Sequence, residues 1–199
     1  MKQEFDPQTI TRRSMLVGLG SALMLLPIPS ALARAFAKAP KWDSRFELAI
    51  RLELPVQEGF RVHRPYVAIW IEDLNGKSLR TVSLWVQTQR RGPRWIPDLR
   101  RWYRGEESRA ATDGGDLVTT ISSATRNAGI YDLVWDGKTD KGAVVTQGEY
   151  YVCIEAVREH GSYQLIREKI RVGNKPFNAK YTGNEEIKEA SVDFRKRRS

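Results

Sequence analysis

Cysteine and histidine are scarce in this chain of 199 residues, which has one cysteine and two histidines. The single cysteine, Cys153, excludes an internal disulfide, and its place in an alternating stretch predicts a small buried side chain. With only His63 and His160 present, no Cys/His cluster can form, so nothing supports a zinc or haem site built from these residue types. We therefore expect no metal site and, in the leading interpretation, no cofactor.

The chain also lacks an apolar run long enough to span a membrane. The apolar run at residues 16–26 has about eleven residues, whereas a membrane-spanning helix needs about twenty. Arg12 and Arg13 precede this run, and a small-residue stretch with an Ala-x-Ala pattern follows it at residues 31–37. This order predicts a cleaved signal peptide over residues 1–37, and the paired arginines indicate export to the periplasm by the twin-arginine (Tat) route. An uncleaved membrane anchor is the alternative.

Acidic residues are too few to balance the basic ones. Without residues 1–37 the chain keeps 29 Lys and Arg against 22 Asp and Glu. A basic protein often binds nucleic acid, but export argues against that partner here. Anionic membrane surfaces and acidic partners are better candidates, and solubility is the simplest explanation. After signal cleavage we expect no membrane span.

Short alternating stretches dominate the rest of the chain. Residues 46–54 alternate apolar and polar, which is typical of a half-buried strand. Residues 66–73 and 79–86 flank Asn75-Gly76, a strong hairpin signal because both positions of such a turn favour positive φ. Further strands are predicted at residues 116–121, 129–135, 144–145, 149–159 and 163–172.

These strands predict an all-β fold, an Ig-like antiparallel β-sandwich over residues 45–172. One short helical insert is expected at residues 97–103, where Pro97 suits a first turn. Residues 105–115 are predicted to be a loop. Residues 173–199 are polar and basic, and we expect a disordered tail there.

Two resemblances follow from particular motifs. The pattern around Trp135-Asp136-Gly137, which continues through Asp140, Gly142 and Gly148 to Tyr150, resembles the Ig-like domain of flagellar hook-capping proteins. Residues 45–172 as a whole resemble the bacterial family called domain of unknown function 2271. The motifs that carry this second resemblance are Trp70-Ile71-Glu72-Asp73, Arg80-Thr81, Arg94-Trp95-x-Pro97-Asp98-Leu99-x-x-Trp102, Ala124-Thr125-Arg126, Trp135-Asp136-Gly137 and Glu155-Ala156-x-Arg158-Glu159-His160-Gly161.

The second resemblance implies a Tat-exported periplasmic protein without an assigned activity. It also implies a setting similar to that of PepSY-type membrane reductases and of the enzyme that attaches FMN to exported proteins. The FMN attachment motif resembles Asp-x-x-Ser/Thr-Gly-Ala-Thr, with FMN on the last threonine. Thr125 is therefore a flavin-attachment candidate, although Thr119 replaces the aspartate and Ser123 replaces the glycine.

Two segments concentrate residues suited to binding. The insert carries Arg94, Trp95, Asp98, Arg101 and Trp102, which can clamp or stack on an anionic, planar ligand. The turn at Arg158, Glu159 and His160 places a histidine beside a carboxylate, a pair capable of acid–base work. The simpler interpretations are a core face for the tryptophans and solvated charges elsewhere.

Glu72-Asp73 can in principle bind a metal ion, but paired carboxylates that enter an Asn-Gly turn are ordinarily exposed strand-end residues.

The leading functional prediction is a non-enzymatic periplasmic binding or accessory module, linked to an envelope redox or metal-uptake system. Its partner would be an envelope protein, for example a membrane reductase. The alternative is a flavin-carrying redox protein of the cell envelope, with FMN on Thr125. A hydrolase or transferase built around His160 ranks last. We expect any functional surface to lie where the insert meets the turn at residues 159–161.

Export should depend on the arginine pair, because Arg12 and Arg13 precede a weakly apolar run and Arg34 follows it. Replacing both Arg12 and Arg13 by lysine should leave precursor in the cytoplasm, as measured by fractionation and immunoblotting. Normal processing of this variant in the periplasm of a strain without other export routes would contradict the Tat assignment.

Overall fold

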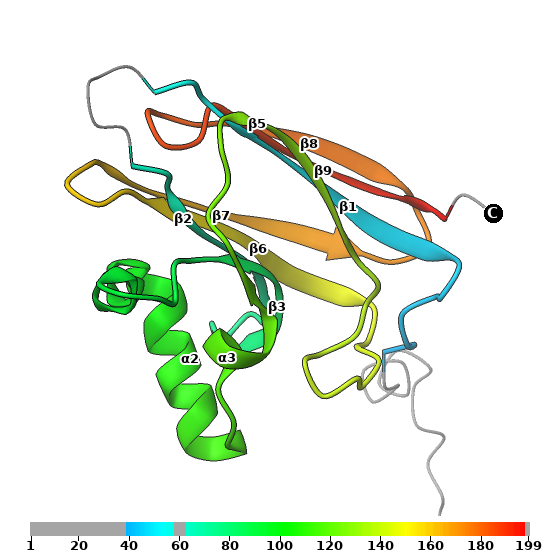
Figure 1. Ribbon diagram of the computed structural model, residues 1–199. Coiled ribbons are helices and arrows are strands. Elements are labelled where there is room, and N and C mark those ends of the chain that lie inside the picture. Colours follow the sequence, from blue (N-terminus) through cyan, green and yellow to red (C-terminus); the bar gives the residue numbers. More distant parts are fainter. Residues whose placement is uncertain (1–38, 58–62, 198–199) are drawn as a thin grey trace, which may run out of the picture. The chain divides into compact units, whose positions relative to one another are not determined.

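The stretches of alternating apolar and polar residues form strands that assemble into two sheets. The computed structural model describes residues 39–57 and 63–197. Within this part, one sheet has four strands in the order β5-β1-β9-β8 and the other has five in the order β4-β3-β2-β6-β7. The two sheets stack face to face, and the helices lie on the far side of the five-stranded sheet (Figure 1). The predicted all-β sandwich is confirmed, whereas its Ig-like topology stays a prediction.

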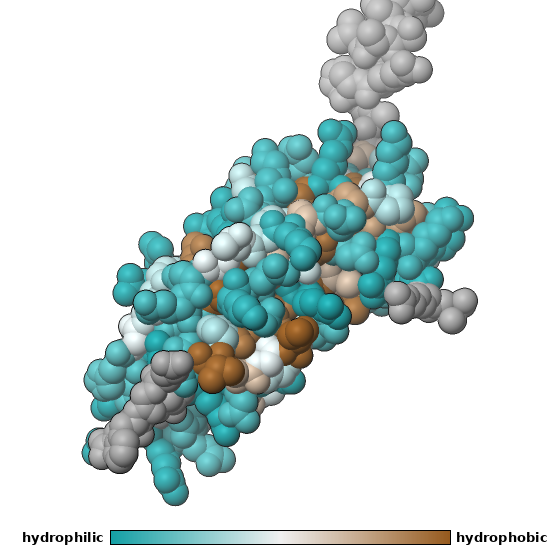
Figure 2. Space-filling model, turned by 90° about the horizontal axis from the view of Figure 1, so that it is seen from above, coloured by the Kyte–Doolittle hydropathy of each residue, from teal (hydrophilic) through white to brown (hydrophobic). Residues whose placement is uncertain are grey.

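The four-stranded sheet is antiparallel throughout. Its strands, in sheet order, are β5 (Gly129–Trp135), β1 (Phe46–Leu54), β9 (Glu189–Lys196) and β8 (Phe177–Thr182). The even-numbered residues of β1 point into the core, and the odd-numbered ones point outward. Seen from above, the surface is mainly hydrophilic with a few separate hydrophobic spots (Figure 2).

The centre of the five-stranded sheet is buried on both faces. Its strands, in sheet order, are β4 (Ser122–Ser123), β3 (Ser78–Trp85), β2 (Tyr66–Glu72), β6 (Gly148–Val157) and β7 (Tyr163–Val172). Every residue of β2 is buried: Val67, Ile69 and Ile71 pack between the sheets, while Tyr66, Ala68 and Trp70 pack under the helices. The parallel β3–β4 pair departs from the predicted antiparallel pattern.

The predicted disordered tail is wrong as far as Arg197. Residues 177–182 and 189–196 form β8 and β9, and β9 lies between β1 and β8. The overall polarity of this segment hides a period of two, in which Ala190, Val192 and Phe194 are each 1% exposed and face the core. The tail is therefore part of the sandwich.

The helical insert is larger than predicted. A 3₁₀-helix, η1 (Gly92–Asp98), leads into α2 (Arg100–Asp113), which includes most of the predicted loop. The expected strand at residues 116–121 is instead α3 (Leu117–Ile121), because the Asp116 side chain accepts a hydrogen bond from the Val118 backbone N–H at 2.8 Å and caps the helix. The strand predicted at residues 144–145 is reduced to an isolated bridge between Lys138 and Val144.

The predicted hairpin is confirmed, with a different turn. The Gly76 N–H donates to the Asp73 carbonyl at 3.0 Å, and Gly76 alone in this turn has positive φ, 81°. The turn at Trp135-Asp136-Gly137 also has a strict glycine requirement. Gly137 has φ 77°, and a Cβ on it would lie 2.3 Å from the Trp42 ring.

A large-to-small substitution tests the place of β9 in the core. Phe194 is 1% exposed and its ring lies 5.0 Å from Phe46 and 5.2 Å from Trp42, centroid to centroid. Phe194→Ala should lower the free energy of unfolding by about 3–5 kcal/mol, measured by urea titration. The control Lys180→Ala, on the exposed side of β8, should change it by less than about 0.5 kcal/mol. Equal stability of the two variants would contradict the placement of β9 in the core.

Candidate functional site

A buried carboxylate holds the N-terminus of α2 on the sheet. The residue before α2, Leu99, offers no side-chain cap. Glu155 of β6, which is 0% exposed, instead accepts hydrogen bonds from the backbone N–H of Arg101 at 2.9 Å and of Trp102 at 2.8 Å. The Tyr163 hydroxyl donates to the same carboxylate at 2.7 Å. This charge satisfies free N–H groups and lies at the positive end of the helix.

A second buried carboxylate, Glu72, ties α2 to β7. Arg101 donates to both of its oxygens at 2.8 Å, and Arg167 donates to Oε2 at 2.9 Å. Trp70 Nε1 donates to Oε1 at 2.9 Å. Burial alone would raise the pKa of Glu72, but the hydrogen bonds from the two arginines and the tryptophan outweigh it, so the pKa is lowered. Glu72 is thus an anchor for cations of this chain.

Other residues with potential chemistry also have structural roles. Burial, followed by the charge of Glu72, raises the pKa of Cys153, so this thiol is not an activated nucleophile. The Asp73 side chain accepts the backbone N–H groups of Asn75 and Lys77, both at 2.9 Å, and so organises the hairpin turn. Within residues 39–57 and 63–197, no group of three or more His, Cys, Asp or Glu is placed to hold a metal ion.

The structure brings part of the predicted surface together. Arg94 Nη2 lies 3.5 Å from Glu159 Oε1, and the rings of Trp95 and His160 meet edge to face with centroids 5.2 Å apart. The insert and the β6–β7 turn are therefore adjacent, as expected. His160 has φ 59°, an uncommon value for a residue other than glycine.

The other predicted binding residues lie elsewhere. Arg101 pairs with Glu72, and Trp102 is 2% exposed with its Nε1 donating to Thr81 Oγ1 at 3.1 Å. Arg158 pairs with Glu186, which is fully buried. Asp98 is half-buried at the end of η1. The simpler interpretation, in which the Arg101 charge is solvated, is wrong because Arg101 pairs with a buried carboxylate, whereas its role in binding stays a prediction.

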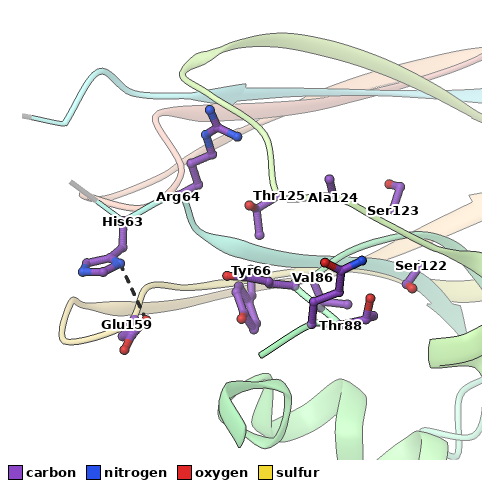
Figure 3. A pocket seen from close by; sticks show the side chains of 12 residues that line it. His63, Arg64, Tyr66, Val86, Thr88, Ser122, Ser123, Ala124, Thr125 and Glu159 are labelled. Atoms are coloured by element: carbon purple, nitrogen blue, oxygen red, sulfur yellow. Dashed lines mark ion pairs between the residues drawn. The ribbon is translucent and has the colours of Figure 1, made fainter. Parts of the chain in front are cut away.

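A polar hollow beside this surface has a volume of about 560 Å³, and we name it the Thr125 cavity. It opens between the start of β2, the segment after β3, the segment after β4 and the β6–β7 turn (Figure 3). Its lining consists of His63, Arg64, Tyr66, Val86, Gln87, Thr88, Gln89, Ser122, Ser123, Ala124, Thr125 and Glu159. Of these, only Thr125 and Glu159 were predicted as site residues, because the lining comes from segments that lie far apart in the sequence.

Hydroxyl and amide groups dominate this lining. The Thr125 side chain points toward Tyr66 across the cavity, and Arg64 stands at the rim with its guanidinium turned away from Tyr66 (Figure 3). The Tyr66 hydroxyl donates to the Gly92 carbonyl at 3.0 Å and so joins η1 to β2. The Glu159 carboxylate lies 3.6 Å from His63 Nδ1 and is also paired with Arg94. The Glu159 carboxylate therefore already has Arg94 and His63 as polar neighbours.

The Val86 N–H donates to the Ser123 carbonyl at 2.9 Å, which fixes the segment before Thr125 against β3.

A family model described as "Predicted periplasmic protein (DUF2271)" matches residues 47–189. The chain belongs to this family. The DUF2271 match runs from β1 to the start of β9, so it includes the whole insert and every segment that lines the Thr125 cavity.

The DUF2271 description agrees with the predicted periplasmic location, while the twin-arginine route rests on residues 1–37, which lie outside the described residues. No curated protein and no solved structure matches the chain, so the hook-capping resemblance stays a prediction. No helix within the described residues is long and apolar enough to cross a membrane.

The ion pair between Arg101 and Glu72 leads to a prediction about stability and its pH dependence. Arg101→Ala leaves a buried acceptor with fewer partners and should lower the free energy of unfolding by roughly 1–3 kcal/mol at pH 7. The exposed neighbour Arg104→Ala should change it by less than about 0.5 kcal/mol. Urea titrations of both variants provide the measurement.

The direction with pH follows from the lowered pKa of Glu72. A carboxylate with a lowered folded-state pKa stabilises the fold above its unfolded pKa and loses that contribution as the pH falls through the folded value. The difference between wild type and Arg101→Ala should therefore shrink below the ordinary Glu range. A constant difference down to pH 2 would show that Glu72 is not the group involved.

Proposed function

We propose that this protein is a non-enzymatic binding module of the periplasm and that the Thr125 cavity holds its ligand. The cavity itself carries the proposal: at about 560 Å³ it falls within the range of roughly 300–1,000 Å³ typical of ligand sites. Four separate segments supply its hydrogen-bonding groups, and the sheet and the backbone contacts of β4 hold them in place. A pre-formed polar site of this kind suits recognition of a small molecule.

The ligand is a small polar molecule with an anionic group. Hydroxyls of Thr88, Ser122, Ser123 and Thr125 and the amides of Gln87 and Gln89 offer both donors and acceptors. Arg64 has no carboxylate within 4.0 Å among the described side chains, so its charge is free to pair with an anion from the rim. Glu159, the carboxylate of the lining, already faces Arg94 and His63.

The arrangement of the histidines favours binding over catalysis. A nucleophile and its base have to lie within hydrogen-bond reach. In the part of the chain that the structure describes, the polar contacts of both His63 and His160 are with the Glu159 carboxylate and not with a hydroxyl of the cavity. The His160 side chain is 74% exposed and packs against Trp95. A hydrolase or transferase built around His160 is therefore the weaker proposal.

The predicted export signal and the family description support a role for this module in the cell envelope. The predicted Tat signal and the description of the family both favour work outside the cytoplasm. We propose an accessory role for an envelope redox or metal-uptake system, with an envelope protein such as a membrane reductase as partner.

A second candidate, a flavin carrier, is favoured by one observation. Thr125 is half-buried and lines the cavity, where its hydroxyl could bear the phosphate of FMN while the ring system occupies the hollow. The preceding residues fit less well. Thr119, at the aspartate position of the motif, belongs to α3 and its hydroxyl donates to the Asp116 carbonyl, and Ser123 replaces the glycine. Bound FMN would supply electron-transfer chemistry.

Mass spectrometry of protein purified from the periplasm tests both candidates. Under native conditions the wild type should carry a small molecule that denaturation removes. Arg64→Gln and Thr125→Val should reduce the occupied fraction severalfold, because each removes one polar contact of the lining. Arg171→Gln, an exposed arginine of β7, is the matched control and should retain full occupancy.

The outcomes separate the candidates. A yellow protein whose added mass survives denaturation and is absent from Thr125→Val would establish the flavin carrier instead. A wild type without any adduct, or equal loss in Arg171→Gln, would contradict ligand binding in the Thr125 cavity.

A further inference from the structure

A second polar cavity lies at the other end of the β2–β3 hairpin. It has a volume of about 540 Å³ and lies between the hairpin turn and α2. We name it the Lys77 cavity; the hairpin contributes Glu72, Lys77 and Ser78 to its lining, and α2 contributes residues between Arg101 and Asp113. None of the groups proposed for the Thr125 cavity belongs to it.

The face of α2 that borders this cavity is polar and small. Arg101, Gly105, Ser108 and Thr112 follow each other at spacings of four, three and four residues, so they share one side of the helix. Trp102, by contrast, packs into the core under the sheet. A Cβ placed on Gly105 would lie 3.9 Å from the Ser78 Cβ, which shows how closely helix and hairpin approach there. Small side chains on this face leave the hollow open.

The charges around the cavity do not balance. Glu72 is paired with two arginines, Arg101 and Arg167. The other lining carboxylate, Asp113, pairs with Lys141 at 2.8 Å, and the lining cation Arg109 pairs with Glu106 behind it at 2.6 Å.

Two lining cations remain beyond these pairs. Lys77 and Arg104 are both exposed, and among the described residues no carboxylate oxygen lies within 4.0 Å of the Lys77 ammonium or the Arg104 guanidinium. The cavity and its paired groups therefore carry a net charge of about +3, which favours anions.

We propose that the Lys77 cavity is a binding site for compact oxyanions with two or more negative charges, such as polycarboxylates or phosphorylated small molecules. Lys77 and Arg104 supply the charge that the carboxylates of the chain do not neutralise. Ser78, Ser108 and Thr112 supply hydroxyl donors to further oxygens. The Arg101–Glu72 pair forms one wall and keeps its position because Arg167 and Trp70 hold the same carboxylate.

Isothermal titration calorimetry of the exported chain with citrate, pyrophosphate and acetate at low ionic strength tests this site. Citrate or pyrophosphate should bind saturably with one site per chain, acetate should bind far more weakly, and added salt should weaken binding. The preferred probe distinguishes a carboxylate ligand from a phosphoryl ligand. Lys77→Gln and Arg104→Gln should each lower the affinity by on the order of tenfold, since each removes one charge-assisted contact.

Two further variants test whether binding depends on the open cavity and not only on overall positive charge. Gly105→Leu changes no charge and enters a position with room for a Cβ, so it should fill the cavity and block binding while the helix is retained. Lys175→Gln removes an exposed positive charge between β7 and β8 and should bind like the wild type. Absence of saturable binding by the wild type, or equal weakening by Lys175→Gln, would overturn the proposal. Unchanged binding by Gly105→Leu would overturn it as well.

Discussion

The structure depends on two carboxylates that the five-stranded sheet buries beneath its helices. Glu155 takes the place of a side-chain cap at the start of α2 by accepting backbone N–H groups there. Glu72 accepts a hydrogen bond from the guanidinium of Arg101 in the same turn. Pairs of this kind contribute little net stability compared with apolar packing, but a buried charge that loses its partner is costly, so the helix has few alternative positions. Because α2 forms one wall of the Lys77 cavity and continues η1, which Tyr66 ties to β2, these contacts also fix the surroundings of both cavities.

Much of the sandwich could be predicted because a half-buried strand leaves a period of two in the sequence. β1 and the β2–β3 hairpin show that pattern clearly. β9 shows it as well, in Ala190, Val192 and Phe194, but the charged residues between them made the segment look like a solvated tail. The length of α2 was missed for a different reason: Gly105 suggests a loop, yet it lies inside α2, whose Trp102 packs into the core. In this segment tertiary packing overrides the low helix propensity of glycine.

The candidate sites were harder to predict, since cavities arise where segments distant in sequence meet. The meeting of the insert and the β6–β7 turn was anticipated from composition, and Arg94, Trp95, Glu159 and His160 do lie together. Arg101 was misjudged because its partner, Glu72, looks like an exposed strand-end residue when read with Asp73. A useful signal was nonetheless present. Glu72 and Glu155 each stand in a nearly continuous apolar run, and a charge at such a position requires a buried partner.

The place of β9 has a consequence for the order of synthesis and folding. β1 is the first strand made and β9 the last, yet the two pair along eight residues, from Phe46 with Lys196 to Glu53 with Glu189. Closing so long a loop is slow, and the closure cannot begin before β9 has emerged from the ribosome. Until then β1 keeps one backbone edge without its partner and exposes apolar residues that β9 later covers. The nascent chain therefore has a period in which it depends on protection from aggregation, and that period lasts at least until β9 has been made.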